Sequence, residues 1–303
     1  MNVALACLGV FVLYWVLYSI YWHAVSPRFD RKTFLITGAS SGIGEEMTKQ
    51  LCKLGAQKIV MCARRVEELE RVKSECRKAG TSTQLEIVQM DLNNPDECLR
   101  WATEYKDRVD ILVNNGGVSQ REPFENCSFA VVDKMMKVNA LSPIALIKGF
   151  LPKMVKQGGG QIVNVLSIAG LVGVPVRTMY SCSKFCLDGF GKALQGEVAK
   201  DNINVLQVYP SYVQTNVSKN ALVGNAEAFG ALDSNIKNGL PVDEAVKVLL
   251  KAIYLRRNQI FIGKMSYAFL TKVLFLSEYL SKTVMASRYK SQMDVIAEAK
   301  KSK

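Results

Sequence analysis

The sequence predicts an α/β fold in which helices cover both faces of one parallel sheet. Short, nearly continuous apolar runs alternate with amphipathic segments from Thr33 onward, and a glycine-rich turn follows the first run. Buried parallel strands give such continuous runs, whereas the helices between them carry one apolar stripe. A chain of 303 residues with 49% hydrophobic content is long enough for one large core. We therefore expect a single doubly wound, Rossmann-type domain.

The predicted elements follow in order. A strand at residues 33–37 leads through the glycine turn into a helix that ends near Leu54. A second strand and a charged helix follow at residues 58–63 and 66–78. Further strands are expected at residues 85–90, 110–114, 161–166 and 203–208. Ligands of doubly wound sheets bind beyond the carboxyl ends of the strands, so the residues there are the functional candidates.

Residues 1–25 are expected to form a transmembrane anchor. The run from Val3 to Trp22 is apolar or aromatic apart from Ser19 and carries no charge. A helix needs about 20 such residues to cross the hydrocarbon layer. A cleaved signal peptide is the alternative, but it usually has a basic start and a shorter apolar core. The expected layout is therefore anchor 1–25, linker 26–32, Rossmann-type domain 33–263 and helical, basic extension 264–303.

The charges around the anchor predict its orientation. Basic residues follow the run, in segment 28–32, and none precedes it, which favours a single-pass protein with a cytosolic domain. Residues 300–303 resemble the dilysine signal of endoplasmic reticulum membrane proteins, so that membrane is the expected location. Two glycosylation sequons, at Asn126 and Asn216, would matter in a lumenal domain, although sequons often arise by chance.

The composition excludes several kinds of site. Eight cysteines form no C-x-x-C pair, and the single histidine, His23, follows the apolar run. We therefore expect no metal, no disulfide framework and no Ser-His-Asp triad. The net charge of +12 favours a phosphorylated cofactor or an acidic membrane surface, and a solvated basic surface beside a membrane explains it more simply. No nucleic acid is expected, because the basic residues are scattered along the chain.

A glycine loop directly after the first strand predicts a dinucleotide site. Its spacing is G-x-x-x-G-x-G over residues 38–44. Glycines let the backbone approach a pyrophosphate, which then lies on the N-terminus of the following helix. The candidate cofactor contacts in the loop are Gly38, Ser40, Ser41, Gly42, Ile43 and Gly44.

The end of the second strand favours NADP(H) over NAD(H). NAD enzymes usually carry an acidic residue there for the ribose 2′-hydroxyl, whereas an arginine suits a 2′-phosphate. This chain has Arg64 and Arg65 there, and no acid before Glu67. We expect Arg64 to bind the phosphate with support from Arg65. The alternative is that both arginines merely begin the next helix.

Tyr180 and Lys184 are the candidate acid–base pair. They read Y-x-x-x-K on a predicted helix, so both side chains share one face. A phenol has a reference pKa of about 10 and needs a group that stabilises its anion, such as an ammonium one turn away. The pattern alone is common on helices. Ser167, which follows the strand 161–166, and Asn139 upstream argue against coincidence.

With these residues the chain resembles the short-chain dehydrogenase/reductase family over residues 32–263. Within it, segments 63–73 and 114–121 are similar to the membrane-anchored SDR family member 7 group. The resemblance implies that Tyr180 protonates the substrate oxygen, Lys184 lowers the Tyr180 pKa and holds the nicotinamide ribose, Ser167 orients the substrate and Asn139 positions a water. It implies further cofactor contacts at Asp91, Leu92, Asn114, Gly116, Val213 and Thr215. Gly117 and Ser211 depart from the usual Ala and Gly of the family.

Two segments bear on the substrate. Residues 216–240 are polar and weakly periodic, and we expect a mobile lid there. Residues 265–285 are apolar and aromatic, with lysines within and beside them. They form either a helix that covers the core or one that lies on a membrane surface.

The expected function is an NADP(H)-dependent oxidoreductase that interconverts a carbonyl and an alcohol. The resemblance implies a lipophilic substrate, such as a steroid, retinoid or fatty carbonyl, and hence a role in lipid metabolism. The alternative is a non-catalytic NADP(H)-binding scaffold or sensor, which would not need the complete set of catalytic candidates. The expected partners are the substrate, membrane lipid and, as a further candidate, a second copy of the chain.

Overall fold

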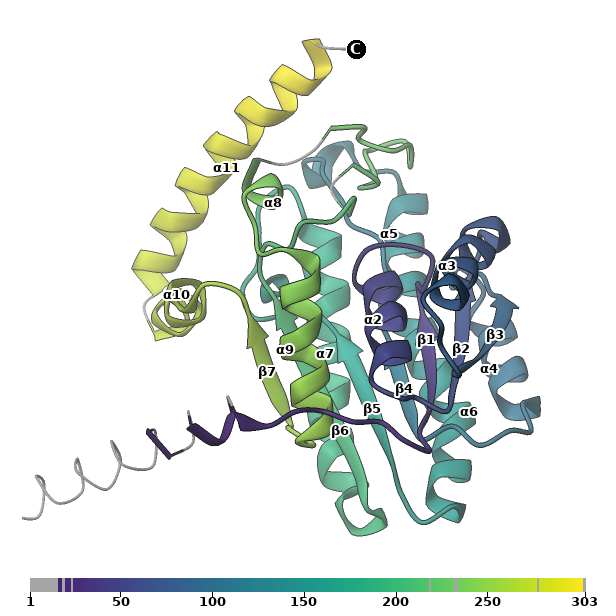
Figure 1. The fold of residues 1–303 in the computed structure, drawn as a ribbon. Coiled ribbons are helices and arrows are strands. Elements are labelled where there is room, and N and C mark those ends of the chain that lie inside the picture. The colour runs from purple at the N-terminus through teal and green to yellow at the C-terminus, as the bar shows by residue number, and fades with distance from the viewer. Residues whose placement is uncertain are drawn as a thin grey trace, which may run out of the picture.

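The sheet of the computed structural model is parallel throughout, with the strand order β3-β2-β1-β4-β5-β6-β7 (Figure 1). The structure describes residues 16–17, 20–22, 24–217, 219–231, 234–276 and 278–301. The strand order reverses between β1 and β4, and a crevice at the carboxyl ends of such strands is the usual ligand site of this architecture. The predicted parallel α/β sheet is confirmed.

The strands agree closely with the runs expected from the sequence. Their bounds are β1 Thr33–Thr37, β2 Lys58–Ala63, β3 Gln84–Gln89, β4 Ile111–Asn114, β5 Gly160–Val165, β6 Ile203–Pro210 and β7 Gln259–Ile262. The edge strand β7 was not among the expected runs. Only Ile262 in it is buried, so its sequence lacks the continuous apolar pattern of the central strands.

Helices lie on both faces of the sheet. Their bounds are α2 Gly42–Lys53, α3 Val66–Lys78, α4 Pro95–Glu104, α5 Phe129–Met136, α6 Ser142–Lys156, α7 Thr178–Glu197, α8 Ser234–Lys237, α9 Val242–Tyr254, α10 Met265–Leu276 and α11 Glu278–Lys301. One core cluster joins α2, α3 and α9 to strand residues such as Phe34 and Ile36. A second joins α4, α6 and α7 to Leu35 and Leu112 on the opposite face. This alternation is the two-residue period of a strand buried on both sides.

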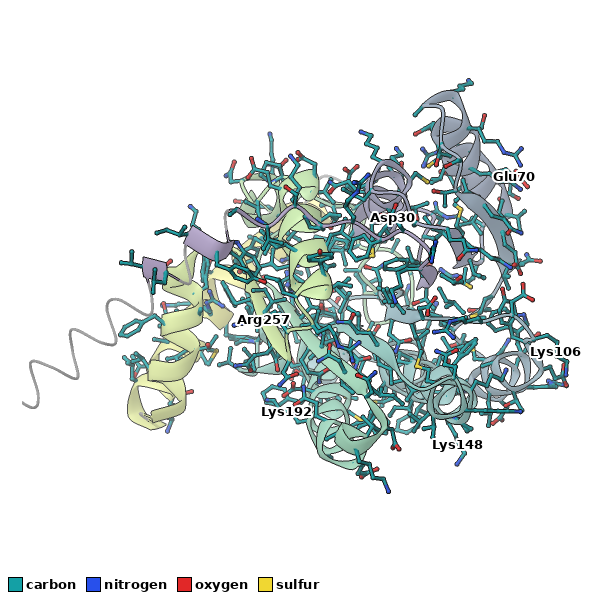
Figure 2. The ribbon with its side chains drawn as sticks, turned by 60° about the horizontal axis from the view of Figure 1, so that its bottom comes forward. Asp30, Glu70, Lys106, Lys148, Lys192 and Arg257 are labelled. Carbon is teal, nitrogen blue, oxygen red and sulfur yellow. The ribbon has the colours of Figure 1, made fainter. Side chains whose placement is uncertain are left out.

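Charged side chains from several elements lie on the outside of these layers. Figure 2 labels Lys106, Lys148 and Lys192, which come from the segment after α4, from α6 and from α7. The basic residues labelled there therefore belong to several elements. This distribution fits a generally basic surface, the simpler explanation of the net charge.

The described residues of segment 216–240 form loops joined by isolated bridges, together with the short α8. Residue pairs Gln120–Leu222 and Val213–Leu240 connect it to the carboxyl end of the sheet. Farther along, the single helix expected at residues 265–285 is two helices, α10 and α11. The mobility of the expected lid stays a prediction.

Most of the expected anchor lies outside the described residues. Residues 16–17, 20–22 and 24 are helical, and among the described residues no helix has the length and apolar character that a membrane span requires. The chain becomes part of the domain core at Phe29, which is 3% exposed and packs edge-to-face on Phe34 and Tyr254. The segment expected as a linker thus contributes a core side chain.

Candidate active site

A cavity lies beyond the carboxyl ends of β1, β4, β5 and β6. Its wall is formed by residues of the glycine loop, the segment after β4, Ser167, α7 and the segment after β6. Predicted residues in its wall are Gly38, Ser41, Gly42, Ile43, Gly116, Ser167, Tyr180, Lys184, Val213 and Thr215. The other predicted residues do not line this cavity: Ser40, Gly44, Arg64, Arg65, Asp91, Leu92, Asn114 and Asn139. The fold therefore brings the acid–base candidates and the glycine loop to the same cavity.

The glycine loop is tightly packed. Gly38 has φ +68°, and a Cβ added there would lie 2.8 Å from the Gly116 Cα. A Cβ at Gly44 would lie 2.4 Å from the Gly38 carbonyl oxygen. Neither position accepts a side chain. The absence of side chains leaves the backbone accessible to a ligand where α2 begins. The N-terminus of that helix, with its unpaired N–H groups, is suited to a phosphate.

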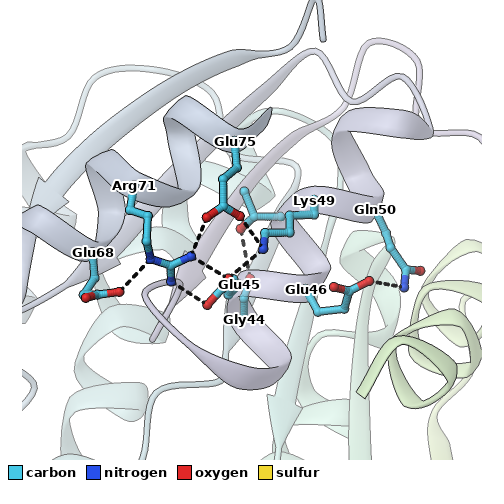
Figure 3. A network of polar contacts seen from close by, with 9 residues as sticks. Gly44, Glu45, Glu46, Lys49, Gln50, Glu68, Arg71 and Glu75 are labelled. Carbon is cyan, nitrogen blue, oxygen red and sulfur yellow. Dashed lines mark hydrogen bonds and ion pairs between the residues drawn. The ribbon is translucent and has the colours of Figure 1, made fainter. Parts of the chain in front are cut away.

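A network of charges fixes α2 against α3 (Figure 3). Arg71 donates to Glu45 through Nη1 and Nη2, at 3.0 and 2.9 Å, and to Glu75 at 2.8 Å. Lys49 pairs with the same two carboxylates at 2.7 and 2.6 Å. Burial would raise the pKa of Glu45, but the hydrogen bonds from Arg71 and Lys49 outweigh it and lower that pKa. The network joins α2, the helix that follows the glycine loop, to α3.

Arg64 and Arg65 stand at the start of α3. Both are exposed, and Arg65 is the N-terminal cap residue of α3. The backbone N–H of Gly38 donates to the Cys62 carbonyl at 2.8 Å, which places the glycine loop beside the end of β2. The arginines thus lie next to the loop, and their side chains are accessible to a ligand. Their position also agrees with the alternative, in which they only begin α3.

Tyr180 and Lys184 lie one turn apart on α7, and the Lys184 Nζ is 5.9 Å from the centre of the Tyr180 ring. Burial raises the pKa of Tyr180, whereas a hydrogen bond with Ser167 and the positive charge of Arg177 act to lower it. Burial lowers the pKa of Lys184 to about 8. Its ammonium donates to the Val165 carbonyl at 2.9 Å. In this arrangement Ser167 and Arg177 are the groups that favour the phenolate.

Asn139 is buried behind the cavity, in a π-helical turn at Lys137–Leu141. Its amide nitrogen donates to the Val118 carbonyl at 2.9 Å and to the Ser183 hydroxyl at 3.0 Å, while its oxygen accepts from the Val118 N–H at 2.9 Å. The side chain therefore couples the segment after β4 to α7. π-Helical turns often occur at functional sites.

Gly117, where the family usually has alanine, lies beside these groups. A Cβ there would be 3.1 Å from the Asn139 Oδ1 and 3.6 Å from the Lys184 Nζ. Glycine thus avoids a close contact with the amide oxygen. The sequence could identify the departure but not this neighbour.

Several residues of the site were not among the sequence candidates. Gln120 is fully buried, and its Oε1 accepts from the N–H groups of Met179 and Tyr180 at 2.8 and 3.3 Å. Arg121, Arg177 and Tyr212 line the cavity. Gln120 and Arg121 belong to segment 114–121, which carries the family resemblance, whereas no sequence motif includes Arg177 or Tyr212.

Comparisons with known proteins identify the family of this chain. The model of the short chain dehydrogenase family matches residues 32–225. Dehydrogenase/reductase SDR family protein 7-like of Drosophila melanogaster is 33% identical over 91% of this chain and 91% of its own. Dehydrogenase/reductase SDR family member 7B of Mus musculus is 32% identical over 94% of this chain and 89% of its own.

Solved structures of similar proteins contain nicotinamide cofactors. A short-chain dehydrogenase from Sphingobium yanoikuyae in complex with NADPH is 26% identical, with a TM-score of 0.67 over 76% of this chain and 87% of that one. A short-chain dehydrogenase/reductase from Burkholderia phymatum in complex with NAD has a TM-score of 0.73 over 84% of this chain and 97% of that one, at 21% identity, and supports the fold. The chain belongs to the short-chain dehydrogenase/reductase family of oxidoreductases, which use a nicotinamide cofactor.

Proposed function

We propose that this protein is an NADP(H)-dependent enzyme that interconverts a carbonyl and an alcohol on a lipophilic substrate. The observation that carries the proposal is the Tyr180 hydroxyl, which hydrogen-bonds Ser167 in the wall of the cavity, with Lys184 one turn away. Val118, Leu166 and Ile236 contribute apolar surface to the same cavity. This lining suits a substrate whose body is apolar and whose reacting group is a single oxygen.

Tyr180 is the proposed proton donor. NADPH, when bound, supplies the hydride. The Tyr180 hydroxyl gives its proton to the substrate oxygen, and Ser167 holds that oxygen with a hydrogen bond. Arg177, together with Ser167, stabilises the phenolate that is left. Lys184 keeps a positive charge near the ring and would hold the nicotinamide ribose. In the opposite direction Tyr180 accepts the proton from the alcohol.

The residues at the first strands fit a phosphorylated cofactor. The glycine loop and the N-terminus of α2 would hold the pyrophosphate. Arg64, supported by Arg65, would hold the 2′-phosphate through charge-assisted hydrogen bonds. Asp91 and Leu92 would lie toward the adenine, and Asn114, Gly116, Val213 and Thr215 would line the rest of the path. The two guanidinium groups, and the absence of an acidic residue between the end of β2 and Glu67, favour NADP(H) over NAD(H).

The Tyr180→Phe variant tests the activity. It removes the transferable proton and leaves the ring in place, so the turnover of NADPH with a panel of retinal, steroid ketones and aromatic ketones should fall by about 100-fold or more. Cofactor binding, followed by the quenching of intrinsic fluorescence, should stay unchanged. Equal turnover by the two proteins would refute the mechanism. Tight NADPH binding without turnover of any compound by the unmodified protein would favour the scaffold or sensor.

We further propose that the protein works at the endoplasmic reticulum membrane, with one span and a cytosolic domain. The uncharged apolar run at residues 3–22, the basic segment after it and the lysines at the end of the chain support this location. An anchored enzyme would meet lipophilic substrates where they are concentrated.

A further inference from the structure

One helix outside the catalytic core contacts the cavity wall. The ring of Tyr267, on α10, packs edge-to-face on the ring of Tyr212 with centres 5.5 Å apart. Tyr212 lines the cavity. The position of α10 is therefore coupled to the rim of the site, although the catalytic groups come from other elements.

One large apolar side chain on α10 is open to solvent. Phe269 is 71% exposed, whereas Thr271 and Leu274 on the same helix are buried. Among the twelve residues of α10 only Lys272 carries a charge. A helix on a water-exposed surface normally presents charged residues outward, so this composition indicates another environment for the outer face.

The N-terminal segment presents a second apolar surface. Val16, Leu17, Ile20 and Tyr21 are 49 to 60% exposed. The Lys251 ammonium on α9 donates to the Trp22 carbonyl and stands 5.6 Å from the centre of the Trp22 ring. This contact fixes where the apolar run leaves the domain. Figures 1 and 2 both show the N-terminal residues on the side of the domain where the yellow C-terminal helices begin.

We propose that α10 and residues 16–17 and 20–22 together form a lipid-binding surface, in which α10 lies in the bilayer interface with Phe269 inserted. The contact between Tyr212 and Tyr267 then stands where the bilayer meets the cavity. A lipophilic substrate would enter past these two rings, a consequence that rests on the proposed function.

A lipid surface fits this face better than another protein would. The described end of the apolar run, residues 20–22, lies at the same side of the domain, and a run of this length and composition would bring a bilayer close to α10. Tyrosine rings are typical of the headgroup region, and Lys264, exposed just before α10, suits anionic headgroups. An interfacial helix buries its apolar face without crossing the membrane.

Depth-dependent quenching of a new tryptophan tests the proposal. The full chain is reconstituted in vesicles of phosphatidylcholine and phosphatidylserine, with or without bromine on the acyl chains. The F269W fluorescence, after subtraction of the unmodified protein, should be quenched by brominated chains about twofold or more strongly than that of F129W. Phe129 is the matched control because it is 80% exposed on α5, far from α10 (Figure 1). Both sites are exposed, so both variants should fold.

Two results would overturn the proposal. The first is equal quenching of F269W and F129W. The second is unquenched F269W fluorescence in a chain that cross-links as a dimer through α10, which would mean that a second copy covers this face.

An activity measurement tests the entry route separately. Phe269→Asp should raise the KM of a membrane-dissolved ketone about threefold or more and leave that of a water-soluble aromatic aldehyde unchanged. Equal changes for both compounds would refute the route. If the unmodified protein reduces neither compound, the proposed function fails, and the quenching result still decides whether α10 binds lipid.

Discussion

At the scale of single residues, Lys184 shows that the site is built at a cost in stability. Its side chain is 4% exposed, and burial lowers its pKa from 10.5 to about 8. Below pH 8 the folded protein therefore carries a buried ammonium that the unfolded chain exposes to water. Such a shift corresponds to roughly 3 kcal/mol against folding at neutral pH, partly offset by the hydrogen bond to Val165.

We therefore expect Lys184→Met to stabilise the cofactor-free protein at pH 7 by ~1–2 kcal/mol while it abolishes turnover. Between about pH 8 and 10.5 the unfolded chain binds a proton that the folded protein does not, so the stability of the unmodified protein rises with pH. The advantage of the variant should shrink over that window. Thermal unfolding at pH 7 and pH 9.5 measures it. Tyr180→Phe serves as a control that loses activity without removing a buried cation, and a Lys184→Met protein less stable than it at pH 7 would contradict the argument.

Arg64 is the residue on which cofactor preference depends. If its guanidinium binds the 2′-phosphate, Arg64→Ala should raise the KM for NADPH about tenfold or more, equivalent to ~1.4 kcal/mol, and leave the KM for NADH unchanged. Arg77→Ala, at an exposed position in the last turn of α3, is the matched control. An Arg64→Ala enzyme with unchanged NADPH affinity would show that the arginine only begins the helix.

At the scale of elements, the sequence predicted what local patterns encode. The central strands are buried on both faces and therefore read as apolar runs, and the glycine loop is required by close backbone contacts at Gly38 and Gly44. The strand β7 and the break between α10 and α11 were missed. The first is short and only partly buried, and the second separates the apolar α10 from the charged α11 with no proline or glycine between them.

The start of α7 depends on a residue outside its own sequence. Gln120 accepts from the Met179 and Tyr180 N–H groups, and its amide nitrogen donates to the Glu122 carbonyl at 3.1 Å. It acts as a helix cap supplied by the segment after β4. We expect Gln120→Ala to cost ~1 kcal/mol of stability, as the loss of a cap does, and to lower kcat about tenfold because Tyr180 shifts.

Two further variants separate positioning from stability. Gln120→Glu keeps an acceptor oxygen and should restore most of kcat. Gln50→Ala removes two hydrogen bonds on α2, to Glu46 and to the Asp243 carbonyl, and should lower stability without the change in kcat. Chemical denaturation and steady-state kinetics give both quantities. A kcat for Gln120→Ala equal to that of the unmodified enzyme would rule out the positioning role.

At the scale of the whole molecule, the cavity is lined by residues that the sequence motifs could not predict. The candidate acid–base residues and the glycine loop have local spacings, so they could be found by reading the chain. Arg177 affects Tyr180 from the start of α7, and Tyr212 reaches the cavity from beyond β6. Arg177 lies close to Tyr180 in the sequence but belongs to no motif, and only the fold brings Tyr212 to the cavity.

The orientation of the whole molecule in its membrane can be tested through its sequons. Asn126 and Asn216 are both exposed, and Asn216 lines the cavity, so a glycan there would obstruct the site. A lumenal domain would present both asparagines to the glycosylation machinery, whereas a cytosolic domain would present neither. We expect the protein from microsomes to keep its mass after glycosidase treatment and to match an Asn126→Gln/Asn216→Gln variant on a gel. A glycosidase-sensitive shift that the double variant lacks would place the domain in the lumen and reverse the topology inferred from the basic segment 28–32.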